Sequence, residues 1–154
     1  MGSYYFDSSG LAKPYVKETG SAWVESLTDL ASGNEIIISL ATGAEVAAAI
    51  CKRARTGALK PADATIALTT FKTEFKTHYF LVNLSNPIID RAMNLAEKHG
   101  LKGYDSIQLA TALELQADRS LTAAPPLTFV SADDKLNTVA QAEGLLVENP
   151  NHHP

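Results

Sequence analysis

Three consecutive isoleucines constrain the fold of this chain more than any other feature. Ile36, Ile37 and Ile38 lie between Glu35 and Ser39 and predict a short strand. Side chains along a strand point alternately to its two faces, so an unbroken apolar run indicates that both faces are buried. Strands of this kind occur in parallel sheets that helices cover on both sides. We therefore expect an α/β domain.

The rest of the chain alternates predicted strands and helices. Further strands are predicted at 4–7, 79–84, 127–131 and 145–148. Helices are predicted at 9–17 (short or kinked by Pro14), 21–30 with Ser21 as N-cap, 41–56, 60–75, 85–98 and 133–143. A further helix is predicted to open at Gly103 and to include Leu113, before an irregular loop at 120–126. This order predicts a three-layer α/β fold with a central parallel sheet of about four to five strands flanked by helices. Residues 1–148 should form one domain, and 149–154 a flexible C-terminal tail.

Composition narrows the class of protein. The chain has 154 residues, of which 45% are hydrophobic and 19% charged, as in a soluble globular domain. No apolar run approaches the ~20 residues of a membrane span, and a basic, hydrophobic leader is missing. The single cysteine, Cys51, excludes an internal disulfide and a cysteine-rich metal site. We expect a cytoplasmic protein with no membrane association.

The net charge of −4 is distributed unevenly along the chain. Residues 51–76 contain six lysines and arginines against two acidic residues, a local charge of +4, so the remainder carries −8. A basic segment opposite an acidic site would suit a polyanion held near metal ions. The same residues would equally suit a solvated helix face.

Four acidic residues stand out by position. Asp7 ends the first predicted strand, Asp105 and Asp133 lie at predicted helix starts, and Glu45 lies near the start of the helix after the isoleucine strand. Singly, each aspartate is explained by helix capping. Glu45 has only apolar neighbours from Ala44 to Ile50, so its helix is expected to be buried nearly all round. A buried carboxylate requires a metal ion or a distant cationic partner.

Together the four acids indicate a metal site. In an α/β fold these positions converge at one edge of the sheet, where hard oxygen ligands suit Mg²⁺ or Mn²⁺. Carboxylates gather cations that bring a phosphodiester close, activate a water and stabilise the leaving oxygen. The pattern therefore predicts metal-dependent phosphodiester hydrolysis.

The segments around these acids resemble those of PIN-domain ribonucleases of the VapC toxin type, from bacterial and archaeal toxin–antitoxin modules. The resemblance covers roughly residues 4–147. It is carried by Tyr-Phe-Asp-Ser-Ser-Gly-Leu-Ala-Lys at 5–13 with Tyr15, by Ser39 with Glu45, by Gly-Tyr-Asp-Ser-Ile-Gln-Leu-Ala-Thr-Ala at 103–112, and by Phe-Val-Ser-Ala-Asp at 129–133. Each piece is weak alone, but their order and spacing agree together.

The resemblance implies a PIN-like fold and an endoribonuclease that depends on Mg²⁺ or Mn²⁺. The implied catalytic and metal-binding residues are Asp7, Glu45, Asp105 and Asp133, supported by the hydroxyls of Ser8 and Ser131. Asp134 is also acidic, which leaves two candidates for the last position, and alignment favours Asp133. A VapB-like antitoxin and a homodimer are also implied. Lys13, Arg53 and Arg55 are candidates for contacts with RNA phosphates.

Two other interpretations compete with this one. Asp7 could be the phosphoacceptor of a phosphatase-like or receiver-like α/β domain. Such phosphatases usually carry a second aspartate two residues on, where this chain has Ser9, and receivers need an early acidic pair that is missing. The chain could also be a PIN-like module that binds RNA or protein without cleaving. The presence of all four acids argues against that alternative.

Overall fold

Five parallel strands form one central sheet in the computed structural model, which describes residues 1–154. Their order across the sheet is β3-β2-β1-β4-β5, so β1 lies at the centre. The strands are β1 Ser3–Phe6, β2 Glu35–Ser39, β3 Phe80–Val82, β4 Thr128–Val130 and β5 Leu146–Glu148. The predicted parallel α/β architecture is therefore confirmed, with strands somewhat shorter than predicted.

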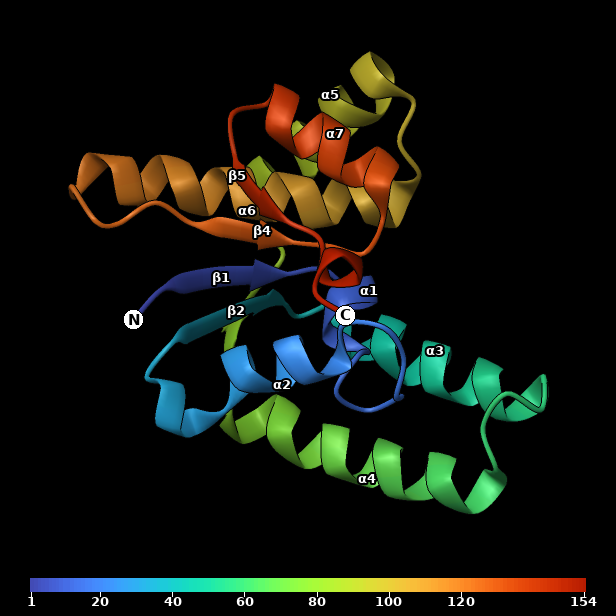
Figure 1. Cartoon of the computed structure of the whole chain (residues 1–154). Coiled ribbons are helices and arrows are strands. Elements are labelled where there is room, and N and C mark those ends of the chain that lie inside the picture. The colour runs from blue at the N-terminus through green and yellow to red at the C-terminus, as the bar shows by residue number, and fades with distance from the viewer.

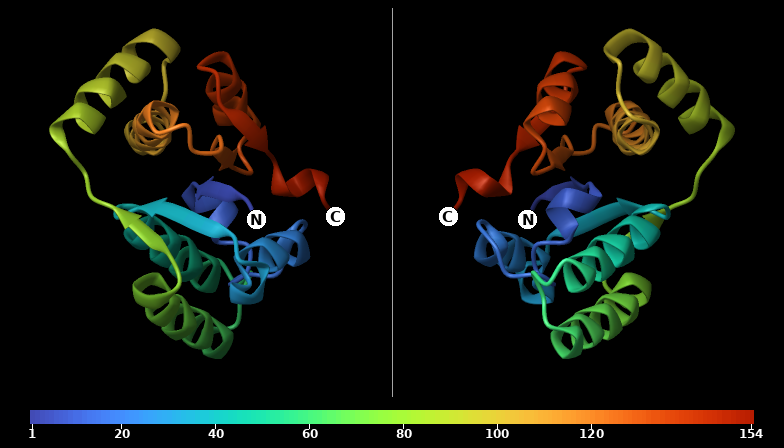
Figure 2. Two further views of the ribbon diagram at one scale, coloured as in Figure 1. Left: turned by 90° about the vertical axis from the view of Figure 1, so that its left-hand side faces the viewer. Right: turned by 90° about the vertical axis from the view of Figure 1, so that its right-hand side faces the viewer.

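Helices cover both faces of the sheet and make three layers (Figure 1 and Figure 2). One face carries α1 Ser8–Leu11, α2 Ser21–Thr28, α3 Thr42–Arg55 and α4 Pro61–Thr77. The other carries α5 Asn86–His99, α6 Gly103–Leu121 and α7 Asp134–Ala142. Short 3-10 turns occur at Leu30–Ser32 and Pro150–His152. No helix is long and apolar enough to cross a membrane.

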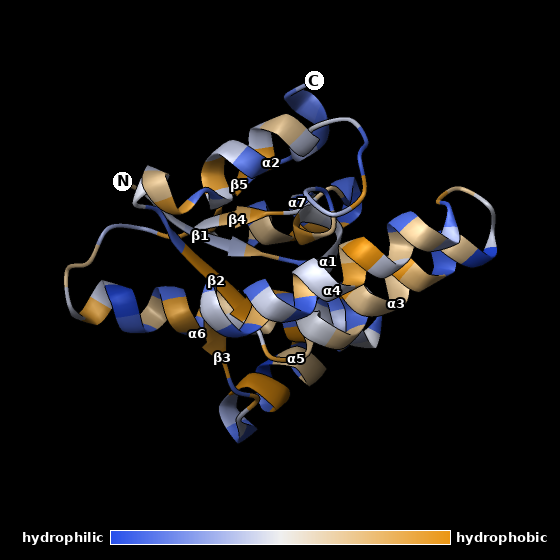
Figure 3. Cartoon of the chain, turned by 90° about the horizontal axis from the view of Figure 1, so that it is seen from below, coloured by the Kyte–Doolittle hydropathy of each residue, from blue (hydrophilic) through white to orange (hydrophobic).

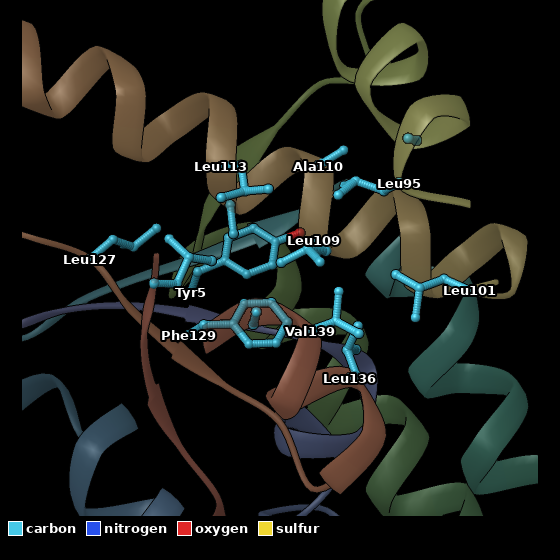
Figure 4. Packing of buried hydrophobic residues seen from close by; sticks show 14 of the residues in the cluster. Tyr5, Leu95, Leu101, Leu109, Ala110, Leu113, Leu127, Phe129, Leu136 and Val139 are labelled. Atoms are coloured by element: carbon cyan, nitrogen blue, oxygen red, sulfur yellow. The ribbon is translucent and has the colours of Figure 1, made fainter. Parts of the chain in front are cut away.

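The isoleucine strand is buried on both faces, as its sequence predicts. Ile37 belongs to the core beneath α5, α6 and α7, whereas Ile36 and Ile38 belong to the core beneath the other helices. Figure 3 shows β2 as a hydrophobic ribbon among helices with hydrophilic outer turns. On the central strand, Tyr5 stacks on Phe129 with ring centroids 5.8 Å apart, within the packed cluster of Figure 4.

Helix ends follow the local signals in most places, and one signal was wrong. Ser85 caps α5 through its Oγ, which accepts the N–H of Ile88, and Gly100 ends that helix in the left-handed region. Ser21, the predicted N-cap of α2, instead lies inside the helix, and Gly20 precedes it at φ 84°. The Ser21 hydroxyl donates to the carbonyl of Lys13 at 2.7 Å, because a tertiary contact competes with the cap.

The last six residues differ from the predicted flexible tail. They follow β5, include the 3-10 turn Pro150–His152 and pack against the N-terminal part of the chain. The ring of His153 stacks on Trp23 at 4.1 Å. Asn151 Oδ1 accepts a hydrogen bond of 2.7 Å from the ammonium of Lys13, which is 3% exposed.

The outer strand β3 leaves an apolar edge uncovered. Phe80 is 61% exposed, Leu81 38% and Leu84 44%. No charged residue occurs from Tyr79 through Ile89. Edge strands are normally protected by charge, proline or a covering segment, so this edge is unusual for a surface in contact with water.

Candidate functional site

The candidate site lies at the carboxyl ends of the central strands. The chain passes from β1 to β2 on one side of β1, whereas β4 lies on the other side, so the direction of winding reverses there. Ligands of open α/β sheets bind at such a point. Asp7 directly follows β1, and Ser131 directly follows β4. Two predicted site residues are thus brought together by the parallel pairing of these strands.

Asp7 is buried and held by neutral donors. Its side chain is 4% exposed and caps α1, where Oδ1 accepts the N–H of Gly10 at 2.8 Å. The hydroxyl of Ser9 lies 2.8 and 3.0 Å from the two oxygens, and that of Ser131 donates to Oδ2 at 2.8 Å. Asp7 is therefore fixed in direction without any cation beside it.

Glu45 projects toward the same place from the first turn of α3. Its Oε2 accepts from Ser8 at 3.1 Å and its Oε1 from Gln108 Nε2 at 2.6 Å. The expectation that this helix is buried nearly all round was wrong, because Ala44 and Ala48 are exposed and Glu45 is half-buried. Of the two expected partners, a metal ion or a distant cationic side chain, the second is not found, and neutral side chains contact the carboxylate.

Asp105 and Asp133 lie at the starts of α6 and α7. With Asp7 and Glu45 they form a row of four carboxylates. Asp105 lies in the first turn of α6, and Asp133 caps α7 by accepting the N–H of Leu136 at 3.0 Å. The neighbouring Asp134 turns away, and its Oδ1 accepts from Asn149 at 2.7 Å. Of the two adjacent acids, Asp133 is the one whose charge acts on Asp105.

Mutual repulsion links the four carboxylates. Burial raises the pKa of Asp7 to about 6, and Glu45 adds to the rise. Burial raises the pKa of Glu45, and Asp105 raises it further. Burial likewise raises the pKa of Asp105, with a contribution from Asp133. Since none of the four forms an ion pair, their arrangement favours a divalent cation as a partner.

The donor set suits a hydrated hard cation better than a fully enclosed one. No three acidic, histidine or cysteine side chains lie close enough to surround an ion by themselves. Mg²⁺ commonly keeps several waters and takes one or two carboxylates together with substrate phosphate oxygens. A row of neighbouring carboxylates fits that mode of binding, and its residues therefore fit Mg²⁺ or Mn²⁺.

The predicted phosphate-binding cations do not gather at the carboxylates. Lys13 is buried against Asn151 and Glu18, and Arg53 pairs with Glu18 at 2.6 Å. Arg55 is exposed at the far end of α3, roughly 15 Å along the helix from Glu45 at 1.5 Å per residue. These pairings differ from the sequence-based expectation, because Asn151 lies 138 residues from Lys13 and Glu18 lies 35 residues from Arg53, too far to be recognised as partners.

Two other lysines do lie near the site. Lys102 precedes α6, and Lys135 lies in the first turn of α7. Both are exposed, neither forms an ion pair, and both lower the pKa of Asp105 in opposition to burial. They are positive charges free to meet a polyanion beside the carboxylates.

Sequence reasoning also missed two polar residues that hold the acids. Ser9 contacts both oxygens of Asp7 and accepts the N–H of Ala132 at 2.9 Å, which ties the ends of β1 and β4 together. Gln108 contacts Glu45 from α6. The available signal for Gln108 was its place in an otherwise apolar run, Ile107 to Leu109.

The family of the chain follows from comparison with known proteins. A family model described as PIN domain matches residues 4–142. The chain belongs to the PIN-domain family, which confirms the resemblance in the sequence. Its relative Ribonuclease VapC45 of Mycobacterium tuberculosis (strain CDC 1551 / Oshkosh) is 30% identical over 143 residues, covering 93% of this chain and 92% of the relative.

Solved structures show the same fold. FitAcB from Neisseria gonorrhoeae superposes with a TM-score of 0.62 at 18% identity, covering 97% of this chain and 99% of that chain. A toxin–antitoxin complex from Klebsiella pneumoniae superposes with a TM-score of 0.53 at 22% identity, covering 96% and 97%. These likenesses confirm the predicted three-layer, PIN-like architecture.

Proposed function

We propose that this protein is a cytoplasmic endoribonuclease that depends on Mg²⁺ or Mn²⁺ and is the toxin of a toxin–antitoxin module. The observation that carries the proposal is the row of Asp7, Glu45, Asp105 and Asp133 at one sheet edge, in which like charges repel and no cation is paired. The relative VapC45 is named a ribonuclease, which supports RNA as the substrate class.

In this proposal Asp7, Glu45 and Asp105 would hold the main divalent ion partly through its bound waters, and Asp133 would complete or share a second one. When bound, such ions lower the pKa of an attacking water and stabilise the charge on the phosphodiester oxygens. The protein's part is orientation. Ser9 and Ser131 fix the carboxylate of Asp7, and the strand order keeps it at the switch point of the sheet.

Binding of RNA to a row of negative charges needs compensating cations. We infer that Lys102 and Lys135 contact phosphates on either side of the scissile bond, because they are exposed, unpaired and close enough to act on Asp105. Contacts of this kind position the strand without reading its bases. Arg55, exposed further along α3, remains a candidate for a more distant phosphate.

Replacing Asp7 by Asn tests the proposed chemistry. RNA cleavage by the purified variant in Mg²⁺ or Mn²⁺ should fall to the level seen with EDTA, because the variant loses one charged ligand while keeping its shape. Asp134→Asn is the matched control, since Asp134 bonds to Asn149 outside the row. Undiminished cleavage by the Asp7→Asn protein contradicts the assignment.

An antitoxin is the proposed protein partner. The Klebsiella pneumoniae structure is a toxin–antitoxin complex, which supports a small VapB-like protein that blocks the carboxylate row. The product of the reading frame beside this gene should co-purify with the chain and suppress RNA cleavage when the two are expressed together. Cleavage that persists in a stable complex contradicts a blocking partner.

A homodimer is the second proposed assembly. The uncharged apolar edge at Phe80, Leu81 and Leu84 supports it, since a neutral surface meets its own copy across a two-fold axis without repulsion.

The competing functions differ in what they require of Asp7. A phosphoacceptor domain of this kind needs a second acid beside Asp7, but Ser9 lies two residues on and donates its hydroxyl to Asp7 instead. A module that binds without cleaving needs no metal. Titration with Mn²⁺ separates the cases, because a catalytic site should bind the ion and lose that binding when Glu45 becomes Gln.

A further inference from the structure

A single glutamine interrupts the apolar face that α6 turns toward the sheet. Gln108 is 1% exposed, and Leu109, Ala110, Ala112 and Leu113 around it are core residues. A buried amide without partners costs free energy, so its hydrogen bonds must account for its place in the core.

Both N–H groups and the carbonyl oxygen of this amide have partners. The hydroxyl of Tyr5 donates to Oε1 at 2.6 Å. Nε2 donates to Thr42 Oγ1 at 2.9 Å and to Oε1 of Glu45 at 2.6 Å. Gln108 thereby connects the central strand β1 with the first turn of α3, which carries Glu45.

Tyr5 determines which way the amide faces. The tyrosine is fully buried and stacks on Phe129, and Figure 4 shows its hydroxyl oxygen beside the part of α6 that carries Leu109 and Ala110. Burial raises the pKa of Tyr5, so the hydroxyl stays protonated and donates. If the amide were reversed, its oxygen would face the carboxylate of Glu45. Repulsion between these oxygens disfavours the reversed orientation.

We propose that Gln108, oriented by Tyr5, is a positioning residue that fixes the carboxylate of Glu45 for binding of the divalent ion. A neutral amide orients the carboxylate and leaves its negative charge in place. A lysine or arginine at the same position would cancel that charge. The proposal rests on the proposed function and deepens it. Outer partners of metal-binding carboxylates typically contribute 10–100-fold to metal affinity.

Calorimetric titration of the full chain with Mn²⁺ tests this proposal directly. Gln108→Leu should weaken Mn²⁺ binding about 10–100-fold, because Glu45 loses its fixed donor. Gln116→Leu should leave the affinity unchanged. It is the matched control, since Gln116 lies on the same helix and bonds to the N–H of Leu127 at 2.8 Å, outside the carboxylate row.

A double variant separates positioning from packing. Gln108→Leu leaves the buried hydroxyl of Tyr5 without its hydrogen-bond acceptor, which lowers the free energy of unfolding. Adding Tyr5→Phe removes that hydroxyl, so thermal stability should recover while Mn²⁺ affinity stays weak. The double variant also provides a folded protein if the single variant does not fold.

Three results overturn the proposal, and each has a distinct meaning. Unchanged Mn²⁺ affinity in folded Gln108→Leu protein shows that Gln108 does not position Glu45. Recovery of affinity together with stability in the double variant shows that the loss came from core packing. Absence of Mn²⁺ binding by the unsubstituted chain overturns the proposed function itself, and this inference with it.

Discussion

Asp7 carries two opposing demands within one side chain. Its oxygens accept hydrogen bonds from Gly10, Ser9 and Ser131, which favour the charged form. Burial and the nearby Glu45 disfavour that form and outweigh them, so the pKa rises to about 6. Asp7 is therefore costly to ionise in the folded protein, and a bound cation would offset that cost.

The raised pKa of Asp7 predicts how stability depends on pH. Because folding raises this pKa from 3.8 to about 6, the carboxyl's contribution is most favourable below its unfolded pKa and is lost as the pH rises through about 6. In EDTA at neutral pH, Asp7→Asn should therefore unfold at higher urea concentration, with a gain on the order of 2–3 kcal/mol.

The difference between the two proteins should shrink toward zero near pH 4. Urea denaturation followed by circular dichroism across this range measures it, and Asp134→Asn is again the control. Equal stabilities at neutral pH would show that the fold tolerates the Asp7 charge without a cation.

Single residues also show where sequence reasoning reached its limit. The acids were predictable because each follows a strand or begins a helix, and parallel strands share one carboxyl edge. Gln108 and Ser9 were not singled out, because their roles depend on contacts with Glu45 and Ala132 that lie far away in sequence. The burial of Lys13 was unpredictable for the same reason.

At the scale of elements, local signals were sufficient where tertiary contacts agree with them. Ser85, Pro87 and Gly100 bound α5 as predicted, since a cap, a proline and a left-handed glycine act within one turn. Ser21 failed as a cap because the carbonyl of Lys13 takes its hydroxyl. Segment 149–154 was predicted to be flexible because nothing in its own composition reveals the partners it meets.

The C-terminal 3-10 turn is predicted to stabilise the N-terminal part of the fold. Removing residues 150–154 should lower the free energy of unfolding by about 2–3 kcal/mol, because the buried ammonium of Lys13 loses Asn151 and Trp23 loses the stacked ring of His153. Urea denaturation followed by circular dichroism gives the value.

Lys13→Met provides the control for that deletion. If the lost bond to Asn151 causes the effect, the substitution should cost less in the shortened chain than in the full chain. Equal unfolding midpoints for the full and shortened chains would contradict a structural role for the segment.

At the scale of the whole molecule, the uncovered edge at β3 predicts self-association. Phe80→Lys should convert a dimer into a monomer, because a charge on each copy would repel across the two-fold contact and need burial. Light scattering over a range of protein concentrations measures the mass. Ile66→Lys is the matched control, since Ile66 is 65% exposed on α4, away from the edge.

Two results would contradict this assembly. If the unsubstituted chain stays monomeric at high concentration, a second copy does not cover the β3 edge. An undiminished dimer in Phe80→Lys places the contact on another surface.

The contact between Lys13 and Asn151 joins positions 138 residues apart, and it has a consequence for the newly made chain. A ribosome releases the N-terminal residues first. Strand β1 can pair with β4, and Asp7 can accept the hydroxyl of Ser131, only after these later residues have been released. The row of carboxylates can therefore assemble only after Ser131 and Asp133 have left the ribosome.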